Sequence, residues 1–163
     1  MNPDPSAPMN DARWLARALD LARANVRTGG GPFGAVVVKD GAVVGEGVNR
    51  VTDAHDPTAH AEVSAIRDAC ARLGAFELTG CTVYSSCEPC PMCLGALYWA
   101  RPDRVVFAAS RHDAARAGFD DAFIYDEIGL DPAARRLPFE HVAVDGLLGP
   151  FEAWDAHEGR TRY

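Results

Sequence analysis

Two short segments of the chain gather the residue types that bind metal ions and move protons. The first, Pro57 to Glu62, contains His60 and Glu62, and the second, Cys87 to Cys93, contains three of the five cysteines. Imidazole and thiolate groups are the ligands that zinc prefers, and three protein ligands leave its fourth position open for water. We therefore predict a zinc site that joins the two segments.

The cysteine spacing leaves more than one set of ligands open. Cys90 and Cys93 are three residues apart, so both can face one ion from the first turn of a helix. Cys87 and Cys90 have the same spacing, and Cys87 could also be a fourth ligand. A helix N-terminus lowers the pKa of a cysteine, which favours the thiolate that binds metal. The other two cysteines, Cys70 and Cys81, are expected to be core thiols.

Glu62 favours a catalytic zinc site over a structural one. It lies two residues after His60, about 200° around a regular helix, so His60 must reach back from the first turn for both to face one ion. A carboxylate beside a zinc-bound water can accept its proton and pass it to a leaving group. A non-catalytic, zinc-stabilised binding module would need no such base and is the alternative from another functional class.

Hydrophobic periodicity predicts the elements that position these segments. Helices are expected at 10–27, 59–73 and 91–100, the first with Asn10 or Asp11 as its N-cap. Strands are expected at 35–38, 42–44, 81–86 and 104–109, the first two joined by a hairpin turn. A helix from 112, a last strand at 139–144 and a last helix at 150–158 complete the prediction. This alternation indicates an α/β fold, a three-layer α/β/α sandwich with helices covering a central sheet.

Length and composition predict a single folded domain. The chain has 163 residues, 48% of them hydrophobic and 24% charged, and we assign 10–163 to the domain and 1–9 to a flexible leader. No apolar run is long enough for a signal peptide or a membrane span, so we expect a cytoplasmic protein. The net charge is −7 and residues 119–163 are strongly acidic, which disfavours a nucleic-acid partner.

The motifs Asp56–Glu62 and Glu88–Cys93 resemble those of the cytidine-deaminase-like superfamily, whose zinc signature pairs His-x-Glu with Pro-Cys-x-x-Cys. This resemblance implies a central mixed sheet flanked by helices. It also implies that His60, Cys90 and Cys93 bind one zinc ion per subunit, with Glu62 as the catalytic acid and base. The same motifs resemble those of bacterial tRNA adenosine deaminases, so they leave the substrate open.

The segments 94–102, 117–125 and 150–163 resemble bacterial guanine deaminases. This resemblance implies hydrolysis of guanine to xanthine and ammonia, in purine salvage or catabolism. It implies a homodimer in which about residues 139–163 are exchanged between subunits. The substrate-binding residues that it implies are Phe33, Asn49, Ala61, Trp99, Asp121 and Tyr163.

Each implied role has a structural alternative. Phe33 and Trp99 would border the purine ring, although aromatic residues are more often part of a core. Asn49 would bond a ring nitrogen or the carbonyl, or it could brace a turn. Asp121 would accept from a purine N–H, or it could be a solvated charge or a helix N-cap, and only the resemblance selects it over its neighbour Asp120. Tyr163 would close the partner subunit's pocket, or it could be a frayed end.

Three other substrates remain open at this point. A tRNA adenosine deaminase must bind the phosphates of its RNA electrostatically, which the acidic C-terminal region disfavours. A guanine nucleoside or an aminotriazine would undergo the same chemistry at an amidine carbon.

Overall fold

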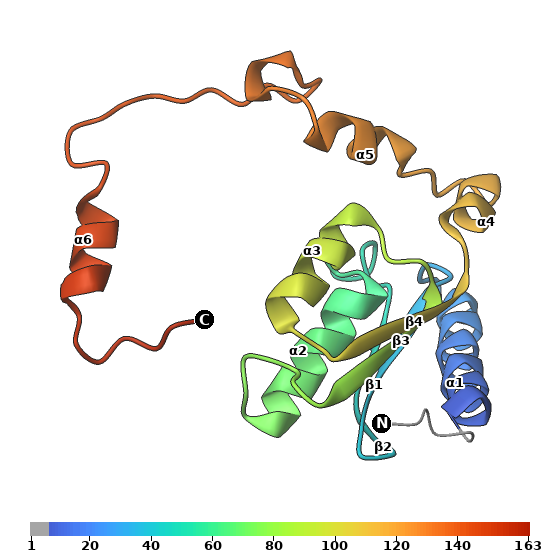
Figure 1. Cartoon of the computed structure of the whole chain (residues 1–163). Coiled ribbons are helices and arrows are strands. Elements are labelled where there is room, and N and C mark those ends of the chain that lie inside the picture. Colours follow the sequence, from blue (N-terminus) through green and yellow to red (C-terminus); the bar gives the residue numbers. More distant parts are fainter. Residues whose placement is uncertain (1–6) are drawn as a thin grey trace. The chain divides into compact units, whose positions relative to one another are not determined.

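The computed structural model describes residues 7–163 of the chain (Figure 1). These residues form two compact units, and the boundary between them falls after Ala122. The first unit carries the sheet and its covering helices. The second unit, Phe123–Tyr163, carries short helices joined by irregular segments.

The first unit is built on a four-stranded sheet with the order β2-β1-β3-β4. Its strands are β1 (Gly34–Lys39), β2 (Ala42–Val48), β3 (Cys81–Cys87) and β4 (Arg104–Ala109). β1 is antiparallel to both β2 and β3, whereas β3 and β4 are parallel. The hairpin turn between β1 and β2 has positive φ at Asp40 (49°) and Gly41 (73°), which matches the twist of paired strands. The predicted mixed sheet and its hairpin are confirmed.

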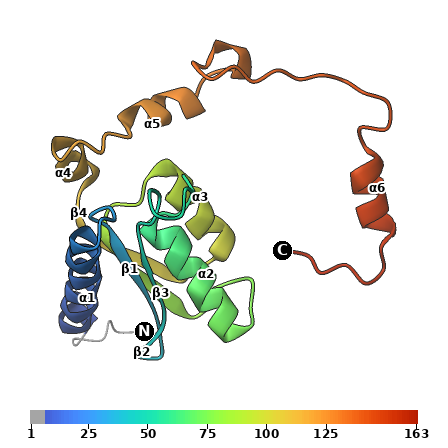
Figure 2. The same cartoon turned by 180° about the vertical axis from the view of Figure 1, so that it is seen from behind.

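Helices cover both faces of this sheet (Figures 1 and 2). α1 (Ala7–Arg27) packs on one face, where Trp14 and Ala18 meet Val36 and Tyr84. α2 (Ala61–Leu73) and α3 (Pro91–Ala100) cover the other face, around a second buried cluster. Because strand side chains alternate between faces, β1 supplies apolar residues to both cores. The three-layer α/β/α prediction is confirmed.

Two glycines bring α2 close to the sheet. A Cβ at Gly47 would lie 2.2 Å from the carbonyl oxygen of Ala61, and one at Gly45 would lie 2.6 Å from the Cβ of Ala69. β2 continues to Val48, beyond the predicted 42–44, because its pairing with β1 extends to Gly34 opposite Val48. The glycines in this extension allow α2 to lie directly against the strand.

The beginning of α1 differs from the prediction. The helix already includes residues 7–9, which were assigned to the leader, and residues 1–6 lie outside the described part of the chain. Asn10 and Asp11 are therefore inside the helix and neither is its N-cap. The Asp11 carboxylate instead accepts hydrogen bonds from Arg104, at 2.5 Å, and from the hydroxyl of Tyr84, at 2.8 Å. Asp11 therefore forms an ion pair with a residue of β4 in place of the predicted N-cap hydrogen bond.

The C-terminal part of the chain departs furthest from its prediction. α4 (Arg111–Arg116) confirms the helix expected from residue 112, and α5 (Ala122–Ile128) was not predicted. After the short 3₁₀ helix Pro132–Ala134, residues 139–144 form no strand: Phe139 donates its N–H to the carbonyl oxygen of Pro132 at 3.4 Å, and no ladder of backbone hydrogen bonds joins this segment to another described strand. α6 (Gly149–Ala156) corresponds to the expected last helix. Within residues 7–163, no helix combines the length and the apolar character that crossing a bilayer requires.

Candidate active site

The first predicted segment sits at the start of α2, on the side of the sheet that α2 and α3 cover. His60 is the N-cap residue, with extended backbone angles of φ −73° and ψ 159°. Glu62 lies in the first helical turn. His60 therefore stands outside the helical rotation that would separate the two side chains, which removes the geometric conflict noted for a regular helix.

The second segment begins α3 in the same way. Cys90 is the N-cap, with φ −66° and ψ 168°, and Pro91 occupies the first turn, where its missing N–H costs no hydrogen bond. Cys93 follows inside the helix and is fully buried. Both segments therefore place their candidate ligands at the N-terminal end of a helix, where the helix dipole favours negative charge.

Three of the predicted ligands converge. The Nδ1 atom of His60 lies 3.5 Å from the sulfur of Cys90 and 3.5 Å from that of Cys93. The three ligand atoms lie within 4.8 Å of one another. Zinc bonds of about 2.3 Å to sulfur and 2.0–2.1 Å to nitrogen, at tetrahedral angles, would separate nitrogen and sulfur by about 3.6 Å. The group therefore fits a zinc ion with three protein ligands.

Cys87 does not belong to this group. Its sulfur lies 3.6 Å from the carbonyl oxygen of Ser110, and burial raises the pKa of its thiol to about 11. It contributes no atom to the group of three ligand atoms that lie within 4.8 Å of one another. The geometry therefore favours the Cys90 and Cys93 pair over the alternatives that the spacing left open.

The pKa shifts of His60, Cys90 and Cys93 favour the binding of a cation by these three residues. A hydrogen bond from the Cys93 thiol lowers the pKa of Cys90 to about 4. The contact with Cys90 raises the pKa of His60, and contact with Cys90 together with burial raises the pKa of Cys93. Negative charge is thus favoured on Cys90, and a zinc ion at this group would require a neutral His60 and a deprotonated Cys93.

Glu62 lies beside these ligands and is only 5% exposed. One carboxylate oxygen, Oε1, accepts a 2.7 Å hydrogen bond from the Ser85 hydroxyl. The other, Oε2, is 3.3 Å from the sulfur of Cys93. The Glu62 carboxylate therefore lies beside the metal ligands. A general base in this position could take a proton from a water bound to the metal.

A cavity of about 450 Å³ opens onto this group. The predicted site residues that line it are Phe33, Asn49, His60, Glu62, Cys90 and Asp121. Phe33 is held edge-on by the ring of Phe119, with centroids 5.0 Å apart. Asn49 accepts the N–H of Val51 on Oδ1 at 3.3 Å, which leaves its amide N–H groups for a ligand.

The two adjacent aspartates of the cavity wall differ in their surroundings. The Asp120 carboxylate accepts a hydrogen bond from the N–H of Ala122 and so caps the start of α5. Asp121 lies deeper, and burial raises the pKa of its carboxyl group. This difference favours Asp121 as the residue that meets a ligand.

Three predicted substrate-binding residues are not part of this cavity. Ala61 is fully buried in the core. Trp99 lies on α3 with 67% of its surface exposed. Tyr163 belongs to the second unit, where its ring packs against Trp154 with centroids 6.2 Å apart.

Several residues that line the cavity were not predicted from the sequence. These are Gly29, Gly30, Gly31, Val51, Thr52, Glu88, Ala114 and Phe119. The run of three glycines just before Phe33 was the available signal, because small residues allow a backbone to border a ligand. Ser85, which contacts Glu62 from the neighbouring strand, carried no local signal.

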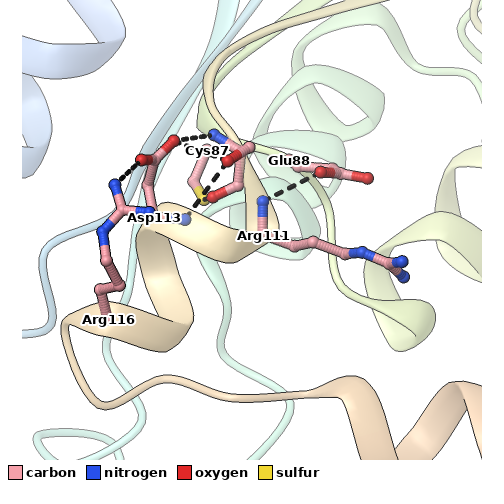
Figure 3. A network of polar contacts seen from close by, with 6 residues as sticks. Cys87, Glu88, Arg111, Asp113 and Arg116 are labelled. Atoms are coloured by element: carbon pink, nitrogen blue, oxygen red, sulfur yellow. Dashed lines mark hydrogen bonds and ion pairs between the residues drawn. The ribbon is translucent and has the colours of Figure 1, made fainter.

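A polar network connects the ligand loop to the cavity wall (Figure 3). Glu88 donates its N–H to the carbonyl of Ala109 and accepts the N–H of Arg111 on Oε2 at 2.9 Å. Ser110 and Asp113 form a reciprocal capping box at the start of α4. The loop before Cys90 is thus fixed to the helix that leads to Phe119 and Asp121.

Comparison with known proteins places this geometry in a family. Residues 8–109 match the model of the cytidine and deoxycytidylate deaminase zinc-binding region, and this range includes His60, Glu62, Cys90 and Cys93. The chain belongs to the cytidine and deoxycytidylate deaminase family. The predicted membership of the superfamily is therefore confirmed.

Within this deaminase family, the similarity extends beyond the zinc-binding region. Guanine deaminase from Bacillus subtilis is 56% identical over 95% of this chain and all of its own length. A tRNA-specific adenosine deaminase from Aquifex aeolicus is 42% identical over 84% of this chain and 88% of its own. A crystal structure of Bacillus subtilis guanine deaminase superposes with a TM-score of 0.92 at 56% identity, covering 93% of this chain and 98% of that one. The resemblance to bacterial guanine deaminases is confirmed.

Proposed function

We propose that the protein hydrolyses guanine to xanthine and ammonia, with one zinc ion per subunit. The observation that carries this proposal is the 56% identity to a guanine deaminase along 95% of the chain, well past the zinc motifs that other deaminases share. A cavity of about 450 Å³ beside His60 and Glu62 is large enough for a purine base.

The proposed reaction assigns separate tasks to the residues of the site. His60, Cys90 and Cys93 would hold zinc, which lowers the pKa of a bound water to about 7. Glu62 would take one proton of the attacking water on Oε2 and deliver it to a ring nitrogen of the base, and would then pass the second proton of that oxygen to the departing amine. Its position between Ser85 and Cys93 supports this role, since Oε2 already faces the ligand group.

Recognition of the base would come from the walls of the cavity. Phe33, held by Phe119, would offer a flat apolar surface to the ring. The Asn49 amide would donate to a ring nitrogen or to the carbonyl, and Asp121 would accept from a purine N–H. A site built on such buried polar groups rejects bases that leave them unpaired.

We further propose a homodimer in which about residues 139–163 are exchanged between subunits. The described residues 123–163 include no buried side chain, although they carry many large apolar ones, such as Phe139, Val142 and Phe151. On α3, Tyr98 and Trp99 are 77% and 67% exposed. Apolar surfaces of this kind are normally covered by a partner. In the dimer, Tyr163 would close the partner subunit's pocket and Trp99 would border the bound base.

The cellular setting follows from the reaction. A guanine deaminase of this kind would act in purine salvage or catabolism, and we propose that it does so in the cytoplasm, on a free base. The net charge of −7 supports a small-molecule substrate over a nucleic acid.

A substrate panel tests the proposal. The zinc-loaded protein is incubated with guanine, guanosine, cytidine and adenine while ammonia release and xanthine formation are followed. We expect xanthine from guanine and little ammonia from the other three. Ammonia from guanosine or adenine without turnover of guanine would refute the assignment.

A tRNA adenosine deaminase is the second candidate, because a protein of that description is 42% identical to this chain. An anticodon stem-loop containing adenosine is added to the same assay. Deamination of that RNA without turnover of guanine would make this second candidate the better one.

A further inference from the structure

A buried hydroxyl on β3 faces the carboxylate that the proposed reaction uses. Ser85 is 1% exposed and donates to Oε1 of Glu62 at 2.7 Å. It lies on the same face of β3 as Cys81 and Val83, which belong to the core beneath α2 and α3. A hydroxyl in such surroundings is costly unless it forms a hydrogen bond, so this contact is a specific feature of the site.

The Ser85 oxygen also takes part in a second contact. The N–H of Cys87 donates to it at 3.4 Å. A hydroxyl can accept and donate at once, so Ser85 donates its hydrogen to Glu62, because a carboxylate oxygen is an acceptor. A chain of hydrogen bonds therefore runs from the backbone of β3 through Ser85 to the carboxylate.

The two oxygens of Glu62 consequently have different surroundings. Oε1 is held by Ser85, whereas Oε2 faces the sulfur of Cys93 at 3.3 Å. Rotation of the carboxylate would break the buried contact with Ser85. The arrangement thus keeps one oxygen pointed at the ligand group, which is the geometry a proton transfer needs.

We propose that Ser85 is a positioning residue that holds Oε1 of Glu62 so that Oε2 stays directed at the metal ligands and at the substrate. The inference rests on the proposed deaminase function. Ser85 does not touch the cavity itself, since it is not among the residues that line it, and it acts through Glu62.

The chain offers a matched control in the next residue. Ser86 is also buried, at 4% exposure, and its hydroxyl accepts the N–H of Gly34 at 3.0 Å. Because strand side chains alternate, Ser86 lies on the opposite face of β3 from Ser85 and Glu62. S85A and S86A each remove one buried hydroxyl from the same strand, and only S85A removes the contact with Glu62.

The experiment compares these variants as zinc-loaded proteins. We expect S85A to lower kcat for guanine by about 10- to 100-fold, as for loss of a hydrogen bond to a charged group, with KM within about twofold. Zinc content should stay at one ion per subunit in both variants, and the crystal structure of S85A should show Glu62 rotated. S86A should lower the melting temperature about as much as S85A and keep the kcat of the wild type.

A double variant tests whether Ser85 acts through Glu62. S85A added to E62Q should leave the residual activity of E62Q unchanged, because a residue that positions a group has no effect once that group is lost. The proposal is overturned if S85A keeps kcat, if S86A loses as much kcat, if S85A loses zinc, or if S85A lowers the activity of E62Q further. Should the wild type deaminate another base instead of guanine, the proposed function fails, and the same comparison is made with that base.

Discussion

Individual side chains at the site have distinct tasks that their surroundings explain. The extended backbone at His60 and Cys90 allows each to act from an N-cap position. Glu62 contributes no ligand atom to the group of three and lies against it. A purely structural zinc site would need a fourth protein ligand in place of this carboxylate.

The first prediction concerns Glu62 itself. E62Q keeps the volume of the side chain and an oxygen that can accept from Ser85, but it cannot carry the proton. We expect kcat for guanine to fall by about 10²- to 10⁴-fold while zinc content, measured by plasma mass spectrometry, is unchanged. Wild-type kcat in E62Q would contradict the assignment of Glu62 as the catalytic acid and base, whereas a wild type without turnover would support a non-catalytic zinc-stabilised module.

Elements position the site through close packing between α2 and β2. Gly45 and Gly47 both contact α2, at different positions along the helix axis. Gly47 lies against Ala61, next to His60 and Glu62, whereas Gly45 lies against Ala69, two turns further along the helix. The position of α2, which carries Glu62, is thus fixed by its direct contact with β2.

The second prediction uses the different positions along α2 that these two glycines contact. G47A and G45A both force a Cβ into α2, and we expect each to lower the free energy of unfolding by about 1–3 kcal/mol in urea titrations. kcat should fall clearly only in G47A, because that clash moves the first turn of α2. Equal losses of kcat in the two variants would contradict the proposed link between β2 and Glu62.

The third prediction concerns the tie between α1 and β4. The guanidinium of Arg104 holds the pKa of the Asp11 carboxyl below its ordinary value of 3.8. The ion pair therefore stabilises the fold above about pH 4, and this contribution is lost as the pH falls through the lowered pKa. Urea midpoints of the wild type and D11N should differ at pH 6 and converge at pH 2–3. A constant difference across this range would show that Asp11 stabilises by packing alone.

At the scale of the whole molecule, the two units differ in how they use their apolar residues. The first unit has two buried cores, one on each face of its sheet. The described residues 123–163 bury no side chain, so their apolar groups need a surface outside their own unit. This contrast is the physical basis for the proposed exchange between subunits.

The fourth prediction tests the exchange by mixing subunits. E62Q has an intact C-terminus, and Y163A has an intact Glu62. We expect each to be impaired alone, and co-expression to restore about a quarter of the wild-type specific activity if chains pair at random, because half of the dimers contain one complete site. Light scattering provides the control that all samples are dimers. A mixture with no more activity than its parts would mean that Tyr163 acts within its own chain or not at all.

Local sequence predicted the residues that converge at the site and most of the secondary structure of the first unit. His60, Glu62, Cys90 and Cys93 were predicted from their types, from their spacing and from a resemblance, because the three-residue separation of Cys90 and Cys93 is typical of a shared metal ion and each segment begins a helix. Hydrophobic periodicity likewise predicted α3 and β4 to the residue.

Only the tertiary structure decided which groups meet across elements. Ser85 reaches Glu62 from a strand 23 residues away, Asp11 bonds Arg104 over 93 residues, and Cys87 is turned toward Ser110. The strand predicted at 139–144 is absent because strands exist only through hydrogen bonds to a neighbour. Periodicity records which side of an element is apolar, whereas the partner that covers that side is chosen by packing of the whole chain.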